Sequence, residues 1–284
     1  MAVESVQVKP PGESPIPRQQ YWCRLQFRKA GNLRLVSHID LLHVFERLMR
    51  RAAIPFASTQ GFHPKPCLAF AQALALGVAG LNEVVDLALR EPLPTAEVLA
   101  RLNRHAPPGL EFLACRALER KSSVQLRRAF YRLPLAATES PEPTGLLGGL
   151  AARCAELMSR DRCLVERLRP QRRFVNVRPY LHELEASHEA LTFALWITPD
   201  GAARPDEIVK ALGLAPLLDA GAVLERTRVE LMDELPADQR WLPAIPRLVD
   251  AAITPEEMIV PATAEMQSRA EQEALIESPM SYET

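Results

Sequence analysis

The sequence predicts an α+β protein with two tandem ferredoxin-like (βαββαβ) domains and a disordered acidic C-terminal tail. Hydrophobic residues make up 48% and charged residues 24% of the 284 residues, so the chain can bury a real core. Extended and helical patterns alternate twice in the order β-α-β-β-α-β, which is the ferredoxin-like order. The composition shifts to prolines and acids after residue 232. The length allows about two domains.

The first predicted domain spans residues 21–119 and follows a disordered leader at 1–20. Residues 21–29 alternate apolar and polar side chains, which favours a strand. Ser37 and Asp40 form an S-x-x-D capping signature that starts a helix, and Pro55 lies just beyond its expected end. The remaining predicted elements are extended runs at 67–76 and 83–89, a helix at 96–103 and a strand at 110–118.

The second predicted domain spans residues 130–232, after a basic linker at 120–129. Its expected strands lie at 130–135, 163–168, 174–177, 190–197 and 223–231, and its expected helices at 145–158 and from Arg204. The two halves share an order of elements without a residue-level repeat. Residues 233–284 carry recurrent prolines and acids and predict a disordered tail.

The net charge of −1 hides an asymmetry along the chain. Residues 233–284 hold eleven acidic and three basic side chains, net −8, which leaves the body at net +7. A basic body favours an anionic partner through its summed field, although an ordinary mixed surface explains a charge of this size equally well.

Cysteine usage and hydropathy argue against several classes of protein. The five cysteines include no C-x-x-C pair, so a disulfide framework, a structural zinc site and an iron–sulfur cluster on this chain are not expected. No signal-peptide core and no run of 18 apolar residues is present, so we expect a cytoplasmic protein with no membrane contact.

The densest polar cluster of the first half is the predicted helix start together with the loop that follows the helix. His38 lies in the first turn, where the helix dipole favours a neutral imidazole that can act as a general base. Lys65 could contact a phosphate, and no metal is expected at this site. The candidate residues lining it are Ser37, Asp40, Gln60, Gly61, Phe62, His63 and Lys65. Helix capping and a tight turn explain the same residues without any function.

Arginines with interleaved aromatic residues indicate a second candidate site, because guanidinium forks suit phosphates and aromatic faces suit stacked bases. The candidate RNA-binding residues are Arg127, Arg128, Arg172, Arg173, Arg178 and Tyr180. A solvated charged face is the competing interpretation, since no specific RNA-binding motif accompanies them.

Several motifs resemble those of the radical-SAM-linked protein family over about residues 20–232. The run R-L-V-S-H-I-D-L at 34–41 resembles R-x-L-S-H-x-D-L, and residues 45–52 resemble F-E-R-x-x-R-R-A. Residues 60–64 are similar to Q-G-F-N-P and continue into an L-x-F-x-x-x-L-x-x-G strand at 68–77. Residues 177–180 resemble L-R-P-Y, and Arg226-Thr227 a late R-T pair. The chain departs from the family at 63–66, which read His-Pro-Lys-Pro instead of Asn-Pro-His-Pro.

The resemblance implies a partnership with a radical-SAM enzyme, which would use SAM, an iron–sulfur cluster and often cobalamin. It implies no cofactor on this chain and no defined reaction. Our leading hypothesis is an accessory module that binds structured RNA for modification. Two alternatives stay open: a metal-independent ribonuclease that uses His38, and a purely structural docking subunit of the enzyme.

Overall fold

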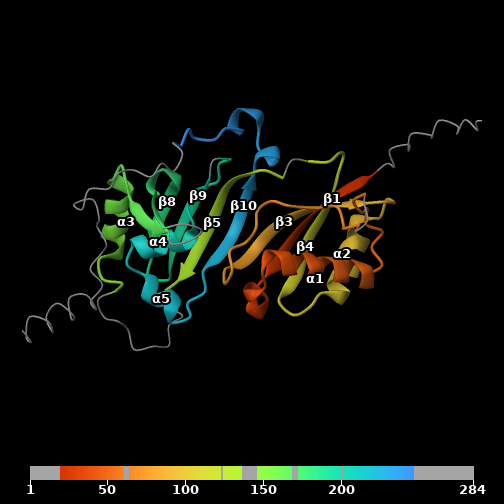
Figure 1. Ribbon diagram of the computed structural model, residues 1–284, viewed down its shortest axis with the longest axis horizontal. Helices are drawn as coiled ribbons and strands as arrows, with labels where there is room; N and C mark the ends of the chain where they lie inside the picture. The colour runs from red at the N-terminus through yellow and green to blue at the C-terminus, as the bar shows by residue number, and fades with distance from the viewer. Residues whose placement is uncertain are drawn as a thin grey trace, which may run out of the picture.

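The computed structural model describes residues 20–60, 64–122, 124–135, 146–167, 172–199 and 201–245, and these form a mixed α+β fold. An eight-stranded sheet runs through the described chain in the order β4-β1-β3-β10-β5-β9-β8, with β2 also paired to β3. Figure 1 shows the first half of the chain, with α1 and α2, at one end of this sheet, and the second half, with α3 to α5, at the other.

The first half contains the six elements expected in that part of the chain. They are β1 (Tyr21–Lys29), α1 (His38–Arg51), β2 (Leu68–Phe70), β3 (Ala79–Leu89), α2 (Thr95–His105) and β4 (Leu110–Leu118), with a 3-10 turn at Gly31–Leu35. β1 pairs antiparallel with both β3 and β4, and β2 pairs antiparallel with β3. β2 is shorter than the predicted run at 67–76, because the chain then leaves the sheet and the Gly77 N–H bonds the Arg34 carbonyl (3.0 Å).

α1 starts and packs as its sequence predicts. The Ser37 hydroxyl oxygen accepts a hydrogen bond from the Asp40 backbone N–H (3.2 Å), which satisfies one of the free donors at the helix start. The buried face consists of Leu41, Phe45, Leu48 and Met49. These side chains recur at helical spacing, so one stripe of α1 faces the sheet.

The second half has one strand more in the main sheet than its sequence indicated. Its elements are β5 (Leu126–Pro134), α3 (Leu150–Ser159), β6 (Leu164–Arg167), β7 (Arg173–Asn176), β8 (Leu181–Ala186), β9 (Ala190–Trp196), α4 (Pro205–Ala211), α5 (Ala215–Asp219) and β10 (Glu225–Leu231). β6 and β7 form a separate two-stranded sheet, and Arg178–Tyr180 is a 3-10 turn. β8 was not predicted, because a register shift between Leu181 and Glu183 breaks the alternation of apolar side chains.

The strands of the two halves form one continuous sheet. β3 and β10 pair in parallel at Ala79–Glu225 and Gly80–Arg226. β5 begins at Leu126, so Arg127 and Arg128, which the sequence placed in the basic linker at 120–129, belong to a strand. The backbone of β3 therefore joins the halves directly.

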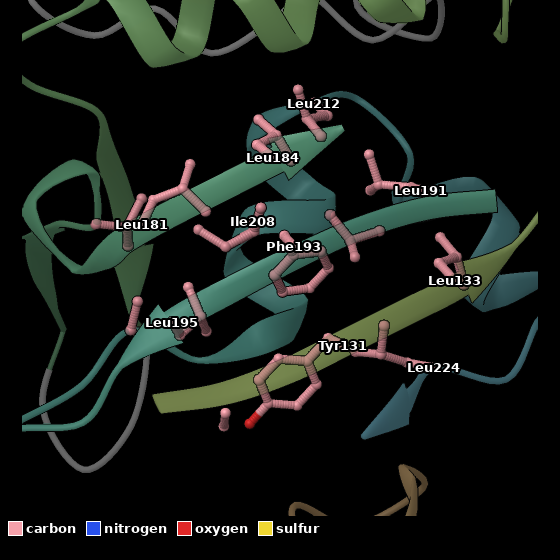
Figure 2. Packing of buried hydrophobic residues seen from close by; sticks show 14 of the residues in the cluster. Tyr131, Leu133, Leu181, Leu184, Leu191, Phe193, Leu195, Ile208, Leu212 and Leu224 are labelled. Atoms are coloured by element: carbon pink, nitrogen blue, oxygen red, sulfur yellow. The ribbon is translucent and has the colours of Figure 1, made fainter. Parts of the chain in front are cut away.

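The sheet carries two hydrophobic cores, one formed by residues of the first half and one formed mostly by residues of the second half. The first core gathers Phe27, Phe45 and Phe112 with Val85, beneath α1 and α2. The second core is larger and includes Val84, which points away from its neighbour Val85 because side chains alternate along a strand. Figure 2 shows part of the second core, in which Tyr131 of β5 and Phe193 of β9 stack with ring centroids 5.3 Å apart and Ile208 and Leu212 approach from the α4 region.

The prediction of a disordered tail from residue 233 is wrong for residues 233–245. This segment forms 3-10 turns at Met232–Glu234 and Ala237–Gln239 and packs against both halves. Arg24 of β1 is 1% exposed and donates to Asp86 (2.7 and 3.0 Å), to Asp233 (2.9 and 3.1 Å) and to Glu234 (2.7 Å). A buried guanidinium needs such carboxylates, and two of them come from the segment assigned to the tail. Residues 1–19 and 246–284 lie outside the described residues.

Candidate nucleic-acid interface

The polar cluster at the start of α1 acts as a helix cap in the structure. The Ser37 hydroxyl donates to Asp40 Oδ2 (2.6 Å) in addition to accepting from the Asp40 N–H. His38 is half-buried, and its ring meets the ring of Phe70 edge-on with centroids 5.2 Å apart. His38 therefore packs at the rim of the first core.

Of the predicted loop residues the structure describes Gln60 and Lys65, and within the described chain neither makes a hydrogen bond or an ion pair with His38. Gln60 and Lys65 are exposed, and the Lys65 N–H bonds the Thr59 hydroxyl (3.1 Å), which closes the base of the loop. Phe70 is the residue that contacts His38. Lys65 precedes Phe70 by five residues, and this length of extended chain spans on the order of 15 Å. The other predicted loop residues, Gly61, Phe62 and His63, lie outside the described residues.

The six arginine and tyrosine candidates for RNA contact fall into different environments. Tyr180 is 0% exposed, which excludes the base stacking expected of it. Arg178 is turned inward, where it donates to the carbonyls of Leu181 (3.1 Å) and Met158 (2.6 Å). Arg172, 76% exposed and paired with Glu166, lies on the β6–β7 hairpin beside Arg173. Arg127 and Arg128 lie on β5 of the main sheet.

A different set of side chains gathers on the face of the second-half sheet that is turned away from the second core. Tyr131 and Phe193 point into that core, so their neighbours along β5 and β9 point to the opposite face. The strand register then sets three rows across β10, β5, β9 and β8: Glu225–Arg132–Thr192–Glu185, Arg228–Phe130–Ala194–Glu183, and Glu230–Arg128–Trp196. We call this surface the open face.

Arginines and aromatic rings alternate on the open face. The Arg228 guanidinium carbon lies 3.5 Å from the centroid of the Phe130 ring. That of Arg128 lies 5.4 Å from Phe130 and 5.3 Å from Trp196. Cation–π contacts of this kind hold the guanidinium groups against the aromatic rings of the sheet face, and a guanidinium group has a second face that can meet another flat group.

A second stack closes one corner of the open face. Arg127 lies with its guanidinium carbon 4.9 Å from Trp196 and 4.8 Å from Trp241, and its Nε donates to the Trp241 carbonyl (3.1 Å). Trp241 is 52% exposed, and the His182 ring meets the Trp196 ring edge-on with centroids 4.7 Å apart. Arg127 is only 6% exposed, so its guanidinium group is not available to a bound RNA. Its contacts with Trp241 hold the segment after β10 against the sheet.

Ion pairs balance most of the charge on the open face. Glu230 pairs with Arg127 (2.8 Å) and Arg128 (2.8 Å), and Glu225 pairs with Arg132 (3.2 Å). Within the described part of the chain, Arg228 has no carboxylate at ion-pair distance. The open face is therefore stiff and close to neutral, with Arg228 as its unpaired cation.

A shallow hollow of about 150 Å³ opens on this face. The short side chains of Thr192 and Thr227 lie between longer neighbours on either side. Its complete lining is Phe130, Tyr131, Arg132, Glu183, Glu185, Thr192, Phe193, Thr227 and Arg228.

Two ion-paired carboxylates, Glu230 of β10 and Asp233 just after it, predict a loss of stability in acid. Burial raises the pKa of Glu230, but hydrogen bonds from Arg128 and Arg127 outweigh burial and hold this pKa below its ordinary value. Burial likewise raises the pKa of Asp233, and hydrogen bonds from Arg24 and Ser122 lower it overall. Because both folded-state pKa values lie below the unfolded ones, the stabilisation is complete above about pH 5 and is lost as the pH falls through the folded values.

We expect the free energy of unfolding, measured with urea, to fall between about pH 5 and pH 3. Asp233→Asn and Glu230→Gln should each make this decline shallower, because each removes one titrating group. Glu111→Gln on β4, an exposed residue away from these arginines, is the matched control. An unchanged slope in the first two variants would contradict the assignment.

No group of three or more His, Cys, Asp and Glu side chains in the described part of the chain is arranged to hold a metal ion. None of the described helices is both long and apolar enough to cross a membrane.

Comparison with known proteins identifies a family. The family model described as "Uncharacterized protein conserved in bacteria (DUF2344)" matches residues 23–205, from β1 to the start of α4. The chain belongs to this family. The match takes in β5, β8 and β9 of the open face, while β10 and the segment that carries Trp241 lie beyond it.

The remaining comparisons add little to this assignment. No curated protein matches the chain. A solved structure, described as an unknown protein from Galdieria sulphuraria, is similar at 13% identity and a TM-score of 0.24, over 75% of this chain and 99% of that chain. A likeness at this level supports no inference about fold or function.

Sequence reasoning missed most of the open face, although a signal was present. Arg128, Phe130 and Arg132 recur at every second position, which places them on one face of a strand. The sequence alone did not indicate that Trp196 and Arg228 would lie beside them, because β9 and β10 come from distant parts of the chain.

Proposed function

We propose that this member of the DUF2344 family is a cytoplasmic accessory protein that binds RNA on its open face and presents it to a radical-SAM enzyme. The observation that carries the proposal is the arrangement of Arg228 over Phe130 and of Arg128 against Trp196 on one sheet face. Sheet faces bearing aromatic rings and arginines suit unstacked bases, which the single-stranded loops, bulges and ends of a structured RNA can offer.

The strand orders support a related proposal about the fold. The first half has the order β4-β1-β3-β2, and the second half has the order β10-β5-β9-β8 with β6 and β7 inserted. We propose that each half is a ferredoxin-like unit, since βαββαβ connections with this order define that arrangement. Each unit then has one face under helices and one face open.

The radical-SAM partnership rests on the sequence resemblance. In this proposal the partner holds the SAM, the iron–sulfur cluster and any cobalamin, and this chain contributes RNA binding. An exposed apolar patch offers the partner a contact: Leu35, Ile39 and Leu76 are 58%, 67% and 68% exposed. The Gly77–Arg34 hydrogen bond brings the segments that carry Leu35 and Leu76 together. The same patch favours the second candidate function, a docking subunit that binds no RNA.

The ribonuclease alternative lacks a comparable observation. His38 has the Phe70 ring as its contact, and the Lys65 expected to assist it lies along the chain on the far side of β2. A general acid or base needs a phosphate-binding group within reach of the same substrate.

Fluorescence anisotropy with a labelled single-stranded RNA tests the proposed function. We expect measurable binding whose affinity falls as salt rises, because phosphate contacts release counterions. Arg228→Ala should weaken binding about tenfold through loss of one stacked cation. Arg104→Ala, on the exposed side of α2, should leave the affinity within twofold. Absent or salt-insensitive binding would favour the docking subunit.

A further inference from the structure

The hollow on the open face combines a flat cationic platform with two carboxylates. Arg228 is exposed and lies on Phe130 at 3.5 Å, so its outer face is presented to the hollow. Glu183 and Glu185 of β8 are exposed on the opposite side of the same hollow. Thr192 and Thr227 lie between them and keep the space open.

The carboxylates are free to accept hydrogen bonds from a ligand. Within the described chain, no cation lies at ion-pair distance from Glu185. Glu183 makes only a long contact with Arg128 (3.7 Å) and a contact with His182 (3.1 Å). The lining of the hollow also holds Arg132 and Arg228, so its charges balance, and the hollow favours a neutral group that donates hydrogen bonds over a phosphate.

The size of the hollow limits the ligand further. About 150 Å³ is well below the roughly 300–1,000 Å³ of drug-sized sites. A single planar heterocycle that stacks on Arg228 fits such a space, with its sugar and phosphate left outside.

We propose that this hollow is a guanine-specific subsite for a base of single-stranded RNA. This inference rests on the proposed RNA binding and adds the identity of one base. Guanine presents two adjacent hydrogen-bond donors, N1–H and the 2-amino group, and one carboxylate can accept hydrogen bonds from both. The guanine ring can at the same time stack on the Arg228 guanidinium. Adenine and cytosine offer one amino donor on the same edge, and uracil offers one N–H between two carbonyls that the carboxylates repel.

The test compares labelled seven-nucleotide oligouridines whose central base is U, G, A or inosine. We expect the G oligonucleotide to bind about tenfold more tightly than the all-U one, because a well-placed bidentate pair discriminates by about that factor. Inosine lacks the 2-amino group and should fall between G and U. Equal affinity for G and U would overturn the subsite.

Variants of Glu183 and Glu185 test the role of the carboxylates separately from that of Arg228. Glu185→Gln and the double variant Glu183→Gln/Glu185→Gln should raise affinity for every oligonucleotide slightly but reduce the G-to-U ratio toward one. Glu111→Gln removes the same charge on β4 and should keep the ratio. A ratio unchanged in the double variant would overturn the role of the carboxylates.

A conservative substitution of Arg228 tests the stacking separately. Arg228→Lys keeps the charge and loses the plane, so the salt dependence should persist while affinity for the G oligonucleotide falls several-fold. Equal affinity of Arg228→Lys and the wild type for this oligonucleotide would overturn the stacking.

The failures of the two proposals are distinguishable. Salt-dependent binding without base preference overturns the guanine subsite and leaves the proposed RNA binding intact. Failure of all four oligonucleotides to bind overturns both.

Discussion

Replacing Arg226 with Ala is expected to lower the free energy of unfolding by about 3–5 kcal/mol, the typical cost of leaving a buried carboxylate without its partner. Arg226 of β10 is 1% exposed, and its Nε donates to Glu83 of β3 (2.8 Å). Its terminal nitrogens donate to Glu83 and to the side-chain and backbone carbonyl oxygens of Gln72 (3.2 Å each). Glu83 is 4% exposed and would keep little access to water after the substitution.

The position of this pair explains the size of the effect. Only the Ala79–Glu225 and Gly80–Arg226 pairs join β3 to β10 in the backbone register, so the ion pair reinforces a short junction. Lys29 is also buried beside it, and burial lowers the pKa of Lys29 while the nearby Glu83 raises it and Arg226 lowers it further. Losing Arg226 therefore changes the charge balance of the whole junction.

Urea unfolding followed by circular dichroism measures the loss. Arg228→Ala is the matched control, since it removes an exposed arginine two residues along the same strand and should change stability by no more than about 0.5 kcal/mol. The double variant Glu83→Leu/Arg226→Met should recover part of the stability, because it removes both charges and keeps apolar volume. Similar losses in Arg226→Ala and Arg228→Ala would contradict the junction role.

Removing residues 246–284 is expected to strengthen binding to single-stranded RNA several-fold at low salt. This segment holds eight carboxylates and two arginines, net −6, and leaves a more positive chain when deleted. The gain should shrink as the ionic strength approaches physiological values, because screening weakens long-range charge effects. Unchanged affinity at low salt would contradict any shielding by the tail.

The cut must fall after residue 245, because a deletion from residue 233 removes structural contacts as well. Asp233 and Glu234 form ion pairs with Arg24. Trp241 contacts both Arg127 and the ring of Trp196. We expect the shorter chain ending at 232 to lose about 2–4 kcal/mol of stability and the chain ending at 245 to lose almost none. A full-length chain in which Glu256, Glu257, Glu271 and Glu273 become Gln is the control, and it should reproduce part of the gain in affinity.

Local signals determined the elements of the first half. The S-x-x-D signature at Ser37 placed the start of α1, and the apolar spacing from Leu41 to Met49 placed its buried face. These features depend on residues three or four apart, so they can be predicted from sequence alone. The same reasoning failed for β8, where a register shift after Leu181 removes the period-two pattern.

Composition misled the analysis at residues 233–245. Acids and prolines there predicted a disordered tail, yet Asp233 and Glu234 serve as counter-ions for Arg24, which is more than 200 residues earlier in the chain. Sequence composition shows that a segment is charged, but it does not show which distant residue forms an ion pair with that charge. The proline-containing segment is held by these distant contacts.

The sequence by itself determined the α+β class, the helix and strand order of the first half and the presence of a basic, arginine-containing body. Only the tertiary structure decided that β3 and β10 join the halves, that Tyr180 and Arg178 face inward and that Arg228 lies over Phe130. The physical reason is that secondary structure depends on neighbours along the chain. Charge pairing and the face on which a residue lies depend instead on strand register between segments far apart in sequence.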